Sequence, residues 1–293
     1  MDHALFVLTN AQAGSEDREQ LHRAEAVLRT GAEVEVKATS GPDELDSALD
    51  QADGRTVVVA GGDGSLHLIA SRLYERGELA GTVLGLIPLG TGNDFARGTG
   101  VPLDVEAAAR VLLARNVEDL DLIVDDLGHI TVNNVHLGIG ADASRYGARW
   151  KDRLGRVGYP IGLLQAAFAD PYRLRVVVDD EIVVDREQPL LEVSLGNGAT
   201  VGGGLALNPG AEPDNGRIDV LVAKATGLPR RLSYGVDLFR GRHPQRRDVV
   251  RRPGHHIQVS GDPVYLSADG EIAGPVTARE WRLLRNAVRV ILP

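Results

Sequence analysis

Two glycine-rich segments carry most of the side chains that could do chemistry in the first part of the chain. The first, GGDGS at residues 61–65, directly follows an apolar run at residues 56–60. Its three glycines let the backbone turn sharply and approach a ligand closely, and the N-terminus of a following helix offers unpaired N–H groups to phosphate. We expect Asp63 to orient Mg²⁺ or to cap the helix rather than to bind the anion itself. Taken alone, the segment is equally compatible with an ordinary glycine-rich turn.

The second segment has the sequence PLGTGNDFAR at residues 88–97 and also follows an apolar run. Gly90 and Gly92 again leave space for a close approach, while Thr91, Asn93 and Asp94 supply a hydroxyl, an amide and a carboxylate. Asn93 or Asp94 could equally be a plain helix cap. Because both turns close strands of the same predicted sheet, together they predict a nucleotide site.

Hydrophobic periodicity predicts the elements that position these turns. Strands are expected at residues 4–8, 34–38, 56–60 and 83–88, and helices at residues 17–28, 43–49, 65–75 and 105–114. Such alternation of strands and helices predicts a doubly wound α/β domain, a parallel sheet covered on both faces. Ligands of these sheets lie beyond the carboxyl ends of the strands, which is where both glycine turns fall.

The pattern changes near residue 121, after which strand-like runs dominate. Strands are expected at residues 129–137, 174–178, 190–195, 218–223, 256–259 and 264–267, and helices at residues 156–168 and 228–239. This predicts a second, largely antiparallel β domain. We therefore place a nucleotide domain at residues 1–123 and a second domain at residues 124–293.

Composition argues against several classes of protein. The net charge of -9 argues against nucleic acid as a partner, because binding to the phosphate backbone relies on excess Lys and Arg. The absence of cysteine excludes disulfides, thiolate metal sites and a cysteine nucleophile. No stretch approaches the roughly 20 apolar residues that cross a bilayer, and residues 1–10 lack the features of a signal peptide. We expect a cytoplasmic protein, peripheral at the inner membrane surface if its substrate is a lipid.

With GGDGS and PLGTGNDFAR in this order and spacing, the chain resembles the bacterial diacylglycerol kinase and lipid kinase family, which includes relatives of the sphingosine kinases. The resemblance continues through GIGAD at 138–142, GGG at 202–204, PDNGRIDV at 213–220 and ADGE at 268–271. GGDGS alone also resembles turns of NAD kinases and 6-phosphofructokinases, whereas PLGTGNDFAR is highly specific. The resemblance implies an ATP- and Mg²⁺-dependent kinase that phosphorylates a membrane lipid, diacylglycerol giving phosphatidate or a close relative. It also implies that the second domain is an antiparallel β-sandwich that holds much of the lipid cleft.

The resemblance further implies roles for individual residues. It places the catalytic base in the turn of Asp269 and Glu271, with Glu271 favoured, although Asp269-Gly270 alone would predict only a tight hairpin. It implies a Mg²⁺ site at Glu212, Asn215 and the carbonyl of Arg217, weakened because Asn215 stands where aspartate is usual. ATP contacts are implied for Asn10, Ala11, Gln12, Ala13, Gly14, Thr39, Gly61, Gly62, Asp63, Gly64, Ser65, Leu66, His67, Thr91, Gly92, Asn93 and Asp94.

Two other functions stay open from the sequence. A kinase for a soluble substrate, NAD or a sugar phosphate, is disfavoured because the motifs of NAD kinases are not evident. A non-catalytic lipid-binding regulator is kept open by Asn215 and by the segment NAQAG at residues 10–14, which lacks the proline usual in the family. A homodimer is compatible with the sequence.

A run of arginines stands out against the acidic chain. It is either a solvated face or a docking patch for anionic lipid headgroups. Its members are Arg230, Arg231, Arg240, Arg242, Arg246, Arg247, Arg251 and Arg252.

Overall fold

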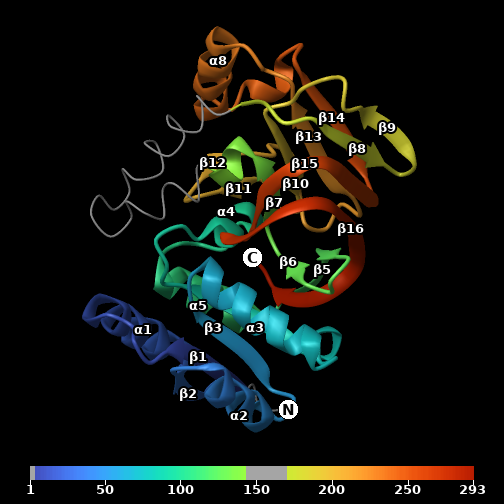
Figure 1. Ribbon diagram of the computed structural model, residues 1–293. Helices are drawn as coiled ribbons and strands as arrows, with labels where there is room; N and C mark the ends of the chain where they lie inside the picture. Colours follow the sequence, from blue (N-terminus) through green and yellow to red (C-terminus); the bar gives the residue numbers. More distant parts are fainter. Residues whose placement is uncertain (1–3, 143–169) are drawn as a thin grey trace. The chain divides into compact units, whose positions relative to one another are not determined.

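The computed structural model describes residues 4–142 and 170–293, which form two compact units (Figure 1). The first unit comprises Met1–Leu122 and Leu284–Pro293, and the second comprises Ile123–Leu283. The sequence-based boundary assigned residues 284–293 to the second domain, whereas here they belong to the first unit. The helix predicted at residues 156–168 lies outside the described residues. Within the described ranges, every helix is too short or too polar to cross a membrane.

The first unit is built on parallel strands in the order β4-β3-β1-β2, which confirms the predicted α/β architecture. Register brings the carboxyl ends of the strands level, with Asn10 opposite Thr39 and Gly61 opposite Pro88. The loops that follow the strands therefore emerge at one edge of the sheet. The strands are β1 (Ala4–Asn10), β2 (Glu33–Thr39), β3 (Thr56–Gly61) and β4 (Val83–Pro88).

Helices connect these strands and pack in two pairs, α1 with α5 and α2 with α3. Arg23 of α1 donates to Glu106 of α5 at 2.8 and 2.9 Å, and Arg72 of α3 binds Asp46 of α2 at 2.5 Å. The chain moves across the sheet in one direction from β1 to β2 and in the opposite direction from β2 through β3 to β4. Because connections between parallel strands are right-handed, helices formed before and after this reversal lie on opposite faces, and the two pairs therefore cover opposite faces of the sheet. The helices are α1 (Ser15–Leu28), α2 (Pro42–Ala52), α3 (Asp63–Glu75), α4 (Asp94–Thr99) and α5 (Val105–Ala114), with a 3₁₀ turn η1 (Leu79–Gly81).

The second unit is mainly antiparallel, as predicted. Its strands run in the order β14-β13-β10-β7-β15, and β8 and β9 extend from β15. The buried Trp281 lies in its main apolar cluster. Its elements are β6 (Ile130–Thr131), β7 (Asn134–Gly138), β8 (Leu174–Val178), β9 (Glu181–Val184), β10 (Glu192–Gly196), β11 (Thr200–Val201), β12 (Leu205–Ala206), β13 (Ile218–Ala223), α8 (Leu228–Phe239), η3 (His243–Gln245), β14 (Val249–Gly254) and β15 (His256–Ala268). Strands β5 (Val117–Asp125) and β16 (Glu271–Ile291) contribute residues to both units.

Three predicted strands differ from those observed. The strand expected at residues 129–137 is split into β6 and β7, because backbone N–H groups at residues 132–134 bind the carboxylate of Asp269. The strands expected at 256–259 and 264–267 are one strand, β15, whose register shifts between Ser260 and Val264. The polar residues around that irregularity interrupt the apolar pattern and make one strand resemble two.

A row of buried polar side chains crosses β7, β10 and β15. His136 lies opposite Ser194 on one side and Ser267 on the other, and all three are almost fully buried. Two residues before Ser194, the buried Glu192 accepts a hydrogen bond from the Tyr234 hydroxyl at 3.2 Å. Burial raises the pKa of Glu192 to about 7 and lowers the pKa of His136 to about 4. The interior thus favours the neutral form of both groups.

Glu192→Gln should change how the free energy of unfolding depends on pH. The raised pKa of Glu192 means that its contribution to stability is full below its ordinary pKa of 4.5 and is lost as the pH rises to about 7. The advantage of E192Q over the wild type should therefore grow across this window by on the order of 3 kcal/mol and then level off. Urea unfolding at a series of pH values measures it.

The exposed Glu187 provides the matched control, because Glu187→Gln should leave the pH dependence unchanged. The contribution of His136 has the opposite sign, since it is present above pH 6.5 and lost towards pH 4. It is common to both proteins and cancels in the difference. A pH-independent difference between E192Q and the wild type would contradict an ionisable carboxyl buried at this position.

Candidate active site

The loop after β1 is folded on itself and tied to β2. The side-chain oxygen of Asn10 accepts the N–H of Gln12 at 2.8 Å, and the N–H of Ala13 donates to the carbonyl of Asn10 at 3.0 Å. Ala11 donates its N–H to the carbonyl of Thr39 at 3.0 Å. The loop then leads into Gly14, the N-cap of α1. Hydrogen bonds therefore give this segment a defined shape.

The two glycine turns lie against each other, backbone to backbone. Leu89 donates its N–H to the carbonyl of Gly61 at 3.0 Å. A Cβ added to Gly90 would lie 2.5 Å from the Cα of Gly62, and one added to Gly62 would lie 2.9 Å from the Cα of Gly90. Real Cβ atoms do not approach so closely, so this contact requires glycine on both sides. The turns predicted from the sequence thus form one continuous structure.

The carboxylate of Asp63 joins the same two turns. Its Oδ2 accepts the N–H of Asp94 and its Oδ1 accepts the N–H of Phe95, both at 2.9 Å. Since both N–H groups belong to the first turn of α4, Asp63 caps α4 rather than the helix on which it lies. The cap expected for the helix after the first glycine turn is thus made to α4 instead, and the Mg²⁺ role of Asp63 stays a prediction.

Asn93 supplies a second link within the turn after β4. It has a left-handed backbone with φ of 52°, and its Nδ2 donates to the carbonyl of Gly90 at 2.6 Å. Its Oδ1 is buried and has no hydrogen-bond partner among the described residues. A buried acceptor of this kind is normally satisfied, so it offers a binding position to a donor of a ligand or to water.

The remaining predicted nucleotide residues differ in what they present. Thr91 is exposed, and Ser65 and His67 are partly buried. The hydroxyl of Ser65 lies against Gly61, where a Cβ would come within 2.5 Å of it. By contrast, the side chain of Leu66 is buried in the core, so only its backbone is available to a ligand.

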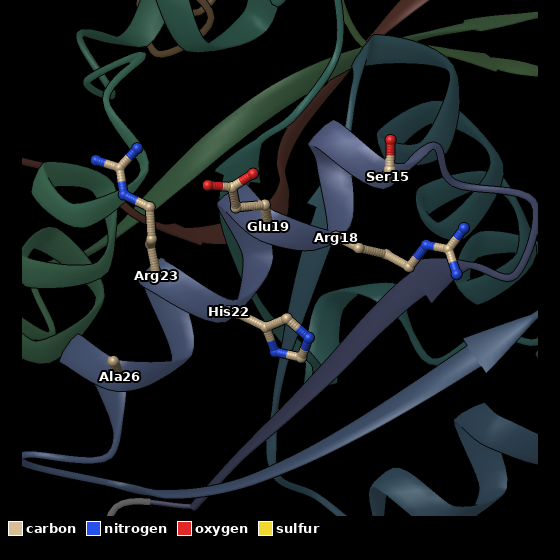
Figure 2. A pocket seen from close by; sticks show the side chains of 6 residues that line it. All are labelled: Ser15, Arg18, Glu19, His22, Arg23 and Ala26. Carbon is tan, nitrogen blue, oxygen red and sulfur yellow. The ribbon is translucent and has the colours of Figure 1, made fainter.

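A surface hollow runs along α1, beginning next to the loop of residues 10–14 (Figure 2). Arg18 donates from Nε to the carbonyl of Gly14 at 3.4 Å, and the guanidinium of Arg23 is occupied by Glu106. The six lining residues are Ser15, Arg18, Glu19, His22, Arg23 and Ala26. Because they come from one helix and include none of the predicted site residues, we do not assign the hollow to the site.

In the second unit, Asp269 and Gly270 form a two-residue hairpin turn between β15 and β16. Both have positive φ, 46° and 92°, and Ala268 pairs with Glu271 across the turn. This geometry is that of a type I′ turn, so the tight hairpin considered from the sequence does form. The carboxylate of Asp269 accepts the N–H groups of Val132, Asn133 and Asn134 at 2.6, 2.8 and 3.1 Å. Asp269 therefore fixes the turn, while the side chain of Glu271 is exposed.

Buried asparagines that the sequence analysis missed surround this turn. The Nδ2 of Asn134 donates to the carbonyls of Gly198 and Thr200, both at 3.0 Å. The Nδ2 of Asn197 donates to the carbonyl of Val132 at 2.7 Å. Two adjacent asparagines stand inside the apolar run at residues 130–137. This pattern could have indicated a structural role for them, because a buried amide needs hydrogen-bond partners. They hold the backbone segment to which Asp269 binds.

The residues predicted to hold Mg²⁺ form a turn closed by its own hydrogen bonds. The side-chain oxygen of Asn215 accepts the N–H of Arg217 at 3.1 Å, and the N–H of Asn215 donates to the carbonyl of Glu212 at 3.3 Å. Of the three predicted ligands only Glu212 offers a carboxylate, and within residues 4–142 and 170–293 no group of three or more His, Cys, Asp or Glu could hold a metal ion. Mg²⁺ prefers several hard oxygen ligands, so this donor set fits the ion poorly.

Comparison with known proteins gives matches over both units. Residues 4–124 match the diacylglycerol kinase catalytic domain, and residues 133–292 match the YegS C-terminal NAD kinase beta sandwich-like domain. A Xanthomonas campestris protein named "Probable lipid kinase YegS-like" is 33% identical over 289 residues, which cover 94% of this chain and 92% of that protein. A Mycobacterium tuberculosis diacylglycerol kinase is 33% identical over 255 residues, 81% of this chain and 76% of its own. A diacylglycerol kinase structure from Bacillus anthracis shares the fold, with a TM-score of 0.74, 18% identity, and coverage of 100% of this chain and 97% of that one.

Asp63→Asn should weaken both the fold of the first unit and nucleotide binding. The substituted amide presents an N–H₂ group to one of two N–H donors, and losing a charged acceptor costs about 2 kcal/mol. We expect this loss in urea unfolding, together with a raised KM for ATP. Asp53→Asn is the control, because Asp53 is an exposed left-handed C-cap that asparagine also tolerates. Unchanged stability of D63N would show that its two hydrogen bonds do not hold α4.

Proposed function

The chain belongs to the diacylglycerol kinase and YegS-like lipid kinase family, and we propose that it transfers the γ-phosphoryl group of ATP to the hydroxyl of diacylglycerol, giving phosphatidate. The observation that carries this proposal is the pair of glycine turns bridged by Asp63 at the carboxyl edge of the sheet. Phosphoryl transfer depends mainly on positioning and on stabilising charge. Two backbone turns held rigidly against each other meet the first requirement.

The ATP phosphates are proposed to bind at the helix N-termini on this edge. The N-terminus of α3 carries backbone N–H groups that the helix does not use, and the adjoining hydroxyls of Ser65 and Thr91 are further donors. Mg²⁺ is proposed to arrive bound to ATP and to neutralise charge on its phosphates. We assign no resident metal to Glu212, Asn215 and Arg217. Since ATP is made inside the cell and the acceptor is a membrane lipid, the protein is proposed to act at the inner membrane surface.

Glu271 is proposed as the general base. A lipid hydroxyl ionises too weakly at neutral pH to attack unaided, so a carboxylate has to take its proton as the oxygen bonds to the γ-phosphorus and ADP leaves. Asp269 already accepts three backbone N–H groups. The side chain of Glu271 is exposed and makes no hydrogen bond or ion pair within the described part of the chain. The carboxylate of Asp269 is therefore already hydrogen-bonded, whereas that of Glu271 is available to take a proton, and this difference favours Glu271 as the base.

Glu271→Gln and Asp269→Asn should therefore fail in different ways. E271Q should lower kcat by at least about a hundredfold with unchanged thermal stability and ATP KM, because an amide cannot take the proton. D269N should lower the melting temperature, because it weakens the anchor of residues 132–134. Glu187→Gln, an exposed carboxylate in the same unit, is the control for both. Near-normal turnover in E271Q would remove Glu271 from the mechanism.

The acceptor itself is tested with radiolabelled ATP, Mg²⁺ and a total lipid extract. We expect one labelled lipid that comigrates with phosphatidate and that E271Q fails to make. A different labelled lipid would keep the kinase and overturn the choice of diacylglycerol. Label transferred only to NAD or a sugar phosphate would overturn the lipid acceptor, and no transfer to any acceptor would favour a non-catalytic regulator.

A further inference from the structure

Helix α8 exposes an apolar stripe on the side opposite its packed face. Leu228, Leu232, Val236 and Phe239 are 45%, 47%, 49% and 59% exposed. Their spacing of four, four and three residues places them on one face of the helix. On the other face, Tyr234 is buried in an apolar cluster of the second unit. The helix is therefore apolar on two sides, and in the described part of the chain only one of them is buried.

This stripe is not part of a general scatter of exposed apolar residues. Single exposed apolar side chains are normal on a protein surface, and the other large ones lie singly on different elements or loops, such as Leu103, Leu127 and Ile182. Only α8, among the described helices, brings four of them together. Contiguous exposed apolar surface of this kind marks an interaction site.

The charge around α8 identifies the chemistry of its partner. Residues 228–247 contain six arginines and one aspartate, in a chain whose net charge is -9. The exposed side chains of Arg240 and Arg242, at the C-terminal end of the helix, make no ion pair or hydrogen bond with described residues. An apolar stripe flanked by cations complements an anionic bilayer, whose surface attracts arginine and whose interior accepts apolar side chains.

Part of the docking patch suggested by the sequence has other partners. Arg246 donates to Asp237 at 2.6 Å and to Asp248 at 2.8 and 2.9 Å. Arg251 is bound to Asp219 and Arg252 to Glu181. Arg246 also donates to the Ser233 hydroxyl at 2.7 Å, so it braces α8 against the segment that follows. Arg246 therefore holds the helix in place, and Arg251 and Arg252 are paired with acidic residues of neighbouring strands.

We propose that α8 docks on an anionic membrane surface, with Leu228, Leu232, Val236 and Phe239 entering the acyl region and Arg240 and Arg242 meeting phosphate headgroups. The 12 residues of α8 span about 18 Å, so the helix lies along the interface and does not cross it. Apolar insertion and headgroup attraction together give the two signals that stable peripheral binding needs. The inference rests on the proposed function only in that the substrate is a membrane lipid.

Vesicle flotation without ATP tests the proposal independently of catalysis. The protein should partition onto phosphatidylcholine vesicles that contain phosphatidylglycerol and much less onto phosphatidylcholine alone. The triple variant Leu232→Ser, Val236→Ser, Phe239→Ser should lower that partition coefficient at least about tenfold. Arg240→Gln with Arg242→Gln should lower it by a similar factor at low salt, with a smaller effect at high salt because screening already weakens the attraction.

The matched control replaces apolar residues exposed elsewhere, Leu103→Ser, Leu127→Ser and Ile182→Ser, and should leave partitioning unchanged. Circular dichroism and thermal melting should be unchanged in every variant, because the replaced side chains lie on the surface. Wild-type partitioning in the stripe variant would overturn the proposal. So would a stripe variant that only changes the oligomeric mass in ultracentrifugation, since the stripe would then join copies of the chain.

Kinase assays separate this proposal from the proposed function. The stripe variant should keep its kcat on detergent-dispersed diacylglycerol and raise only the apparent KM on vesicles. Equal effects in both assays would contradict a role in docking. If the wild type phosphorylates no lipid in either assay, the proposed function fails while the flotation result still decides whether α8 binds a membrane.

Discussion

The carboxylate of Asp63 accepts two backbone N–H groups that lie 31 and 32 residues away, and the arrangement of the two glycine turns at the carboxyl edge of the sheet depends on this contact. It holds α4 against the first glycine turn and keeps Gly62 and Gly90 in backbone contact. Asp269 performs the same task in the second unit, where it accepts three N–H groups from residues 132–134. Backbone N–H groups carry partial positive charge, so a carboxylate binds them more strongly than a neutral oxygen does. In both units, an acidic residue of a sequence motif organises backbone before it can do chemistry.

The fold of the first unit could be predicted well from sequence because its central strands are buried on both faces. Such strands appear as unbroken apolar runs, as in β1, β3 and β4. The long strand β16 was missed, since most of its side chains are exposed or half-buried and it contains Gly274 and Pro275. The break between β6 and β7 was also missed, because its cause is a carboxylate more than 130 residues away. Periodicity records local burial and carries no information on such distant partners.

The candidate site was predicted at the level of segments and less well at the level of side-chain roles. The glycine spacing identified both turns, because a close backbone approach requires glycine and glycine is visible in the sequence. The hydrogen-bond partners of Asp63 could not be predicted in this way, since they are backbone N–H groups and almost every residue has one. Leu66 lies in a motif that faces the site, yet helical periodicity directs its side chain into the core. Similarly, the arginines of residues 246–252 were read as a charged patch because ion pairing with Asp219 and Glu181 is invisible in sequence.

The return of residues 284–293 to the first unit has a consequence for the order in which the chain can fold. Arg289 and Val290 of β16 pair with Val83 and Leu84 of β4, roughly 200 residues earlier in the chain. During synthesis, β4 is therefore the open edge of its sheet until the whole second unit has been made. An open edge strand can pair with other chains, and non-local pairing of this kind is slow. The nascent first unit thus depends on the last strand to close its sheet, and the interval before closure is when it is most exposed to aggregation.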